Sequence, residues 1–153
     1  MICFYTDGAC SKNGSPDAVA GWSYCIVRGD VLLGQDSGFI HNATNNIGEL
    51  WGILKALTYI DTFFTQDAEV IIYSDSAYCV NGINEWRFNW KRNNWTRNGA
   101  ELKNADLWKN IDYYLGRHKN VKVEKVKGHA GDKWNNMADK LAKEGVENGK
   151  AAI

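Results

Sequence analysis

Two carboxylates occupy positions where the sequence predicts the end of a buried strand. Asp7 follows the run Ile2–Thr6 and Asp75 follows residues 69–74, and both runs are rich in apolar, aromatic and β-branched side chains. Taken alone, Asp7 and Gly8 are explained equally well as a turn that only ends a strand. Two carboxylates brought together repel each other unless a cation lies between them, so their meeting would indicate a metal site.

The elements between the two carboxylates determine whether they meet. Residues 44–64 repeat apolar side chains with the i, i+3, i+4 spacing of an amphipathic helix. A strand, a helical crossover and a second strand predict parallel strands, whose carboxyl ends share the edge at which open α/β sheets bind ligands. Two further strands, at 20–27 and 31–40, are expected to continue the sheet as an antiparallel meander.

Three more side chains are candidates for the same site. Glu49 lies in the first turns of the predicted helix, where a favourable interaction with the helix N-terminus explains it equally well. Asp139 lies beside the apolar stripe of a last helix, for which Asp132 is the expected N-cap. His129 lies in the preceding glycine-containing loop, where an ordinary surface histidine is the simpler alternative. The chain is expected to fray from Gly145 onward.

The composition is that of one globular domain spanning residues 1–153. The chain is 44% hydrophobic and 24% charged, and no apolar run approaches the roughly 20 residues of a membrane span. The first strand is expected to begin at once, without a signal peptide, which predicts a cytoplasmic protein. The four cysteines form no CxxC pair and are expected to be small apolar side chains in a reducing compartment.

The formal net charge is zero, but the charges are unevenly spread. Residues 86–127 contain 11 Lys or Arg and 4 Asp or Glu, whereas the remainder contains 7 and 14. Aromatic and cationic residues alternate within 86–97. This segment is expected to be either a small satellite core with solvated charges or a platform for a phosphate backbone.

Five short blocks, in this order, give the whole chain a resemblance to type 1 ribonuclease H of the bacterial-like form. Each block alone is weak, whereas five in the right order on the right elements are highly specific. The blocks are Tyr-Thr-Asp-Gly at 5–8, Thr-Asn-Asn-Ile-Gly-Glu-Leu at 44–50, Ser-Asp-Ser at 74–76, Val-Lys-Gly-His-Ala-Gly at 126–131 and Asn-Met-Ala-Asp-Lys-Leu-Ala at 136–142.

The resemblance implies a fold, a reaction and a cofactor. The fold is a mixed five-stranded sheet in the order 3-2-1-4-5 with helices on both faces. The reaction is endonucleolytic hydrolysis of the RNA strand of RNA–DNA hybrids, largely independent of sequence and assisted by two Mg²⁺ ions, with Mn²⁺ able to substitute. Asp7, Glu49, Asp75 and Asp139 match the metal-binding carboxylates of the family, and His129 matches its mobile catalytic histidine.

The resemblance also assigns a nucleic-acid interface, with the hybrid duplex as partner. We expect a monomer that needs no obligate protein partner. Two departures from the family pattern are Ala77, where a glutamine is common, and Gly48, which is expected to loosen the helix before Glu49. The positions that match substrate contacts are Asn13, Thr44, Asn45, Asn46, Trp86, Arg87, Trp90, Lys91 and Arg92.

Two other functions are compatible with the sequence. Transposases, integrases and junction resolvases carry acidic triads on a similar sheet, although they usually lack the His-Ala-Gly loop and the tryptophan-rich segment. A non-catalytic hybrid-binding module is the alternative from another class, and the loss of any of the four carboxylates would favour it.

Overall fold

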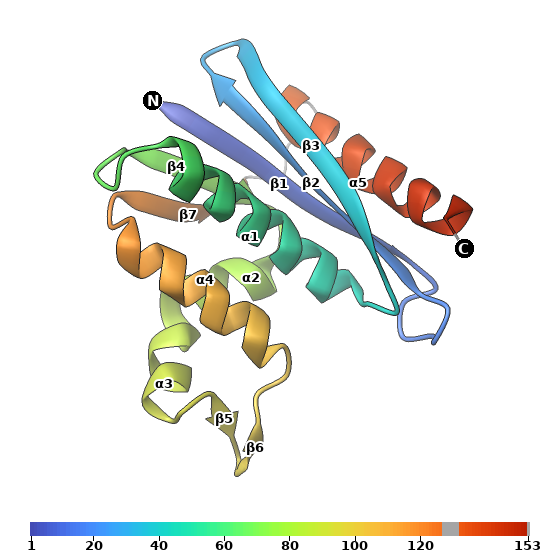
Figure 1. Cartoon of the computed structure of the whole chain (residues 1–153), viewed down its shortest axis with the longest axis vertical. Coiled ribbons are helices and arrows are strands. Elements are labelled where there is room, and N and C mark those ends of the chain that lie inside the picture. The colour runs from blue at the N-terminus through green and yellow to red at the C-terminus, as the bar shows by residue number, and fades with distance from the viewer. Residues whose placement is uncertain (127–131, 153) are drawn as a thin grey trace.

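The computed structural model describes residues 1–126 and 132–152, so the prediction for His129 lies outside the described residues. The main sheet has the order β3-β2-β1-β4-β7, which confirms the predicted mixed sheet (Figure 1). β1, β4 and β7 run parallel, and β2 and β3 continue from β1 as an antiparallel meander. The strands are β1 (Ile2–Ser11), β2 (Val19–Arg28), β3 (Val31–His41), β4 (Val70–Ser74) and β7 (Val121–Lys125).

The helices lie on both faces of this sheet, as predicted. α1 contacts β1, β2 and β4, while α5 contacts β1, β2 and β3. No helix in the described part of the chain combines the length and hydropathy that a membrane span requires. The helices are α1 (Asn45–Phe63), α2 (Ala77–Asn81), the π-helical turn η1 (Gly82–Trp86), α3 (Arg87–Arg92), α4 (Ala105–Arg117) and α5 (Lys133–Ala151).

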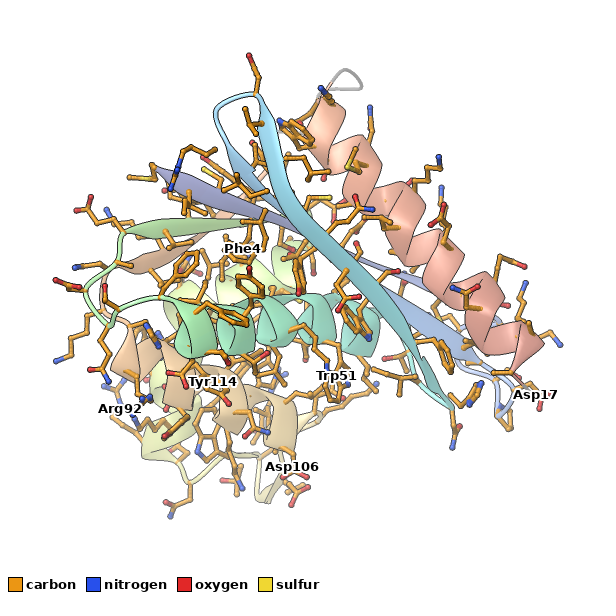
Figure 2. All side chains as sticks on the ribbon, turned by 45° about the horizontal axis from the view of Figure 1, so that its top comes forward. Phe4, Asp17, Trp51, Arg92, Asp106 and Tyr114 are labelled. Carbon is orange, nitrogen blue, oxygen red and sulfur yellow. The ribbon has the colours of Figure 1, made fainter. Side chains whose placement is uncertain are left out.

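Alternation along β2 divides the apolar side chains between two cores. Trp22, Tyr24 and Ile26 belong to the larger core beneath α1, together with Phe4, which is labelled in Figure 2. The residues between them, such as Cys25, pack with Trp134 and Ala138 of α5 in the smaller core on the other face. The period of two residues per repeat therefore places α1 and α5 on opposite faces of the sheet.

Both long helices approach β2 closely at Gly21. A Cβ atom on Gly21 would lie 2.0 Å from the carbonyl oxygen of Ala142 in α5, and a Cβ atom on Gly48 would lie 2.8 Å from the carbonyl oxygen of Gly21. Gly48 is buried within α1. It is therefore a packing residue, and the expected loosening of the helix before Glu49 stays a prediction.

The C-terminal segment is also more ordered than expected. α5 continues to Ala151, with Gly145, Val146 and Gly149 buried. A Cβ atom on Gly145 would lie 2.3 Å from the carbonyl oxygen of Gly38 in β3. The glycines that suggested fraying instead allow the helix to pack against the sheet.

Candidate metal centre and nucleic-acid interface

Asp7 lies within β1 and not at its end, so that part of the prediction is wrong. β1 continues to Ser11 because β2 pairs with it along its whole length, from Ile2 to Ser11. The parallel neighbour β4 does stop, at Ser74, and Asp75 follows it directly. Asp7 and Asp75 therefore meet at the point where β4 ends and β1 is left without a partner on that side. The predicted shared edge of the two strands is confirmed.

Glu49 joins the two aspartates because the start of α1 packs onto β1. The backbone N–H of Gly8 donates to Glu49 Oε1 at 2.8 Å and to Asp7 Oδ1 at 2.9 Å. Carboxylate oxygens of Asp7, Glu49 and Asp75 all lie within 4.8 Å of one another. We call these three residues the carboxylate cluster.

Burial and mutual repulsion shape the electrostatics of the carboxylate cluster. Asp7 and Glu49 are 4% and 9% exposed, whereas Asp75 is exposed. Burial raises the pKa of both Asp7 and Glu49, and the charges of the neighbouring carboxylates contribute in the same direction. Glu49 Oε2 is buried and has no hydrogen-bond partner among the described residues. An unpaired buried oxygen among acidic oxygens fits a hard divalent cation.

Asp139 lies next to this cluster but is not part of it. Ser23 is the β2 partner of Asp7. Its hydroxyl donates to the carbonyl oxygen of Ala138 at 2.6 Å, so Asp139, the next residue of α5, lies on the side of the sheet that the Ser23 and Asp7 side chains face. The Asp139 carboxylate is 46% exposed, and its Oδ2 lies 2.9 Å from Lys143 Nζ. Three of the four predicted carboxylates are thus gathered, and the fourth is in an exposed ion pair beside them.

The raised pKa values predict how stability depends on pH without divalent cations. The unfolded chain loses the Asp7 and Glu49 protons near pH 4, whereas the folded protein holds the Asp7 proton up to a pKa of about 7. Rising pH therefore favours the unfolded state over this interval. In urea unfolding with EDTA, Glu49→Gln should be more stable than the wild type, and the difference should increase from pH 4 to pH 8. A difference that is constant with pH would contradict the electrostatics described here.

The first loop and the N-terminus of α1 form the predicted asparagine-rich part of the interface. Asn13 Oδ1 accepts a hydrogen bond from the backbone N–H of Asn45 at 3.0 Å, so the structure brings these two residues together. Thr44 is the N-cap of α1, and its hydroxyl accepts from the backbone N–H of Ile47. Asn45 and Asn46 are exposed. One edge of the candidate site therefore presents side-chain amides to solvent.

The aromatic residues of the predicted platform pack against the buried side of α4. Trp90 packs edge-to-face against the fully buried Trp108, with ring centroids 4.9 Å apart. The ring centroid of Trp86 lies 5.8 Å from that of Trp90, and Trp86 is 40% exposed. The platform is therefore an extension of the core, and its outer indole faces solvent.

The cations of the platform differ in how free they are. Arg87 Nη1 lies 2.6 Å from Asp112 Oδ1, and these side chains are only 14% and 11% exposed. Lys91 Nζ lies 3.0 Å from Asp112 Oδ2 but is 63% exposed. Arg92 donates to Asn89. Arg87 thus connects α3 to α4, while Lys91 and Arg92 remain accessible; substrate contact by all three stays a prediction.

This difference can be measured as stability. Arg87→Ala should lower the free energy of unfolding by about 3 kcal/mol, because it leaves the mostly buried carboxylate of Asp112 poorly paired. Lys91→Ala is the matched control from the same ion-pair network and should cost less than about 1 kcal/mol, since that pair is exposed. Urea denaturation of the two variants provides the comparison. Equal losses would mean that Arg87 is not the connection between the helices.

One element of the interface was missed by the sequence analysis. β5 (Thr96–Arg97) and β6 (Ala100–Glu101) form a small hairpin after α3, turned by Asn98 and Gly99, which both have positive φ. The Asn-Gly dipeptide is a strong signal for such a two-residue turn and could have revealed it. The hairpin brings Arg97 toward the aromatic residues of the platform, where a cavity of about 520 Å³ is lined by Tyr78, Trp86, Asn89, Trp90 and Arg97.

The family model and the related sequences that match this chain both belong to ribonuclease H. Residues 1–147 match the family model described as RNase H. The ribonuclease H of Caldicellulosiruptor saccharolyticus is 42% identical to this chain over 144 residues, which cover 93% of each sequence.

Solved structures share the fold at lower identity. The foamy viral protease–reverse transcriptase, solved in complex with an RNA/DNA hybrid, matches 96% of this chain with a TM-score of 0.86 and 23% identity; this chain spans only 20% of that one. LC11-RNase H1, also solved in complex with an RNA/DNA hybrid, matches with a TM-score of 0.74 and 21% identity over 98% of this chain and 99% of its own. These two structures support the arrangement of strands and helices described above.

Proposed function

The chain belongs to the RNase H family and is a nuclease, and we propose that it cuts the RNA strand of RNA–DNA hybrids by metal-assisted hydrolysis at the carboxylate cluster. The observation that carries this proposal is the convergence of Asp7, Glu49 and Asp75 within 4.8 Å at one sheet edge. Related proteins of this fold have been solved with RNA/DNA hybrids bound, which supports the choice of substrate. In this proposal residues 1–153 act as one monomeric catalytic domain in the cytoplasm.

The residues of the cluster suit the binding of two Mg²⁺ ions, with Mn²⁺ as a substitute. Bound at this site, the ions would supply an activated water and stabilisation of the leaving 3′ oxygen. Asp7, which shares the Gly8 N–H with Glu49 and lies beside Asp75, would help to hold both ions. Asp139 would be the fourth carboxylate to hold the ions, once it leaves Lys143.

Side chains of the protein itself would orient the substrate and move protons. Asn13, Asn45 and Asn46 can hydrogen-bond sugars and phosphates, which positions the duplex without reading its bases. We assign to Glu49 the recognition of the 2′-hydroxyl of the RNA strand. This hydroxyl is both a hydrogen-bond donor and an acceptor, so it can donate to the Glu49 carboxylate. His129 is assigned to proton transfer or product release, as its residue type and its place in the sequence suggest.

The second strand would be selected as DNA by the platform. A deoxyribose can lie flat against Trp86 or Trp90, where a 2′-hydroxyl would clash. Lys91 and Arg92 are accessible to its phosphates. No described helix is arranged to enter a major groove and read base edges, so little sequence preference is expected.

The test is a comparison of three duplexes that are identical except for their sugars. In Mg²⁺ the enzyme should cut the RNA of RNA–DNA and leave DNA–DNA intact, with RNA–RNA cut far more slowly. Comparable cutting of all three would indicate a general nuclease. Cutting of DNA–DNA alone would favour a resolvase, and tight hybrid binding without any cutting would favour the non-catalytic module.

A further inference from the structure

α5 lies against the sheet along a stripe of small residues. A Cβ atom on Gly21 of β2 would lie 2.0 Å from the carbonyl oxygen of Ala142. One on Gly145 would lie 2.3 Å from the carbonyl oxygen of Gly38 in β3. These contacts set the distance between helix and sheet, but they contain no directional bond that fixes the helix along its own axis. The buried residues of the stripe are Ala138, Ala142, Gly145 and Gly149.

Two side-chain hydrogen bonds connect this stripe to the sheet, one near each end. The hydroxyl of Ser23 in β2 donates to the carbonyl oxygen of Ala138 at 2.6 Å. Nε2 of His41 in β3 lies 2.8 Å from the carbonyl oxygen of Gly149, which can only accept. The two carbonyls are 11 residues apart, which is about 16 Å along the helix. Within the described part of the chain, no other side chain of the sheet hydrogen-bonds to α5.

Ser23 also connects the two acidic elements of the site. It is fully buried, and its partner across the strands is Asp7, so the Cβ atoms of these two residues are about 5 Å apart. The carbonyl that it binds belongs to the residue before Asp139. A serine hydroxyl has one hydrogen, and here that hydrogen goes to α5 and not to the Asp7 carboxylate. The hydroxyl therefore acts on the place of α5, not on the charge of Asp7.

The hydrogen bond from Ser23 is not needed to satisfy the carbonyl of Ala138. This residue lies within α5, where the backbone N–H four residues later already binds its carbonyl. Burying a hydroxyl costs free energy that an alanine side chain in β2 would avoid. Placement of the helix therefore explains the buried serine better than satisfaction of the helix backbone does.

We propose that Ser23 is a positioning residue for Asp139. Its hydroxyl holds α5 at the point along β2 from which the Asp139 carboxylate, once it leaves Lys143, joins the carboxylate cluster in holding the ions. This inference rests on the proposed function, which makes Asp139 the fourth metal-binding carboxylate. Ser23 acts through Asp139 and is not itself a catalytic residue.

Ser23→Ala removes the hydroxyl and little volume, so the variant should fold, as thermal unfolding will show. Its kcat for the hybrid should fall about 10-fold, the scale expected for a residue that orients a metal ligand. The KM for the hybrid should stay that of the wild type, because the amide-lined loop and the platform are unaltered. His41→Ala is the matched control. It removes a side-chain bond from the far end of α5 and should cut the hybrid like the wild type.

Mg²⁺ binding gives a readout that does not depend on cleavage. The backbone N–H of Gly8 donates to two carboxylates of the cluster, so its NMR signal in ¹⁵N-labelled protein reports ions bound there. The Kd for Mg²⁺ obtained from this signal should rise about 10-fold in Ser23→Ala and stay unchanged in His41→Ala. In an Asp139→Asn background, Ser23→Ala should raise the Kd no further, because the residue through which it acts is already impaired.

The proposal is overturned if Ser23→Ala keeps the wild-type kcat or the wild-type Kd for Mg²⁺, or if it fails to fold, which would make the bond purely structural. It is also overturned if Ser23→Ala weakens Mg²⁺ binding as much in the Asp139→Asn background as alone, or if His41→Ala loses as much activity. Failure of the proposed function looks different. The wild type would then leave the hybrid uncut, while Ser23→Ala would still weaken Mg²⁺ binding at the Gly8 signal.

Discussion

Asp7→Asn should lower kcat for hybrid cleavage by about 10³-fold or more, the equivalent of about 4 kcal/mol of transition-state stabilisation. Carboxylate oxygens of Asp7, Glu49 and Asp75 lie within 4.8 Å of one another, so the loss of the Asp7 carboxylate removes one anionic ligand from the cluster. Binding of the hybrid should persist, because the amide-lined loop and the platform are unaltered. Single-turnover cleavage and a binding titration in Ca²⁺ measure the two properties separately.

The same substitution should stabilise the fold in the absence of divalent cations. It removes a charge that burial disfavours, so the thermal midpoint in EDTA should rise while activity disappears. Asp30→Asn, at the exposed turn between β2 and β3, is the control and should change neither property. An Asp7→Asn enzyme with near-normal turnover in Mg²⁺ would remove the carboxylate cluster from the mechanism.

Gly8→Ala should be the most damaging substitution that leaves every carboxylate in place. A Cβ atom on Gly8 would lie 2.3 Å from the backbone nitrogen of Glu49 and 2.5 Å from the carbonyl carbon of Gly48. The obstacle is backbone, so the helix must move away and take Glu49 with it. We expect kcat to fall about 100-fold, as for a displacement of about 1 Å, and stability to fall by about 1–3 kcal/mol.

Gly116→Ala provides the matched control for that substitution. Gly116 lies in α4, and among the described residues no atom outside its chain neighbours and the backbone of its own helix lies within 4 Å of the position that its Cβ would occupy. Alanine there should stabilise the protein by about 0.5–1 kcal/mol and leave activity unchanged. If Gly8→Ala behaves like Gly116→Ala, the close approach of α1 to β1 does not position the site.

The parts of the fold that follow from hydrophobic periodicity were predictable from the sequence. The apolar and β-branched runs before Asp7 and Asp75 and the helical spacing of α1 are local signals, and a strand–helix–strand crossover has few allowed topologies. These three signals bring Asp7 and Asp75 to one edge, which the structure confirms. The short motif blocks added the family and the four metal-binding candidates.

The features that the sequence did not reveal depend on tertiary contact. Gly48 and Gly145 suggested weak helix, because glycine propensity is local, whereas in the folded chain each glycine marks a place where two backbones meet. β1 continues past Asp7 because its partner β2 is long, which no residue near Asp7 indicates. Arg87 resembles the other cations of its segment, and only its contact with Asp112 on α4 shows that it is mostly buried.

The chemical nature of the product ends tests most directly whether the carboxylate cluster hydrolyses RNA with divalent cations. A 5′-labelled RNA strand paired with DNA should be cut only when Mg²⁺ is present, and every fragment should end in a 3′-hydroxyl, with a 5′-phosphate on the downstream piece. Attack by an activated water produces these ends. Cleavage that persists in EDTA and leaves 2′,3′-cyclic phosphates would show attack by the neighbouring 2′-hydroxyl without metal, and would contradict the account.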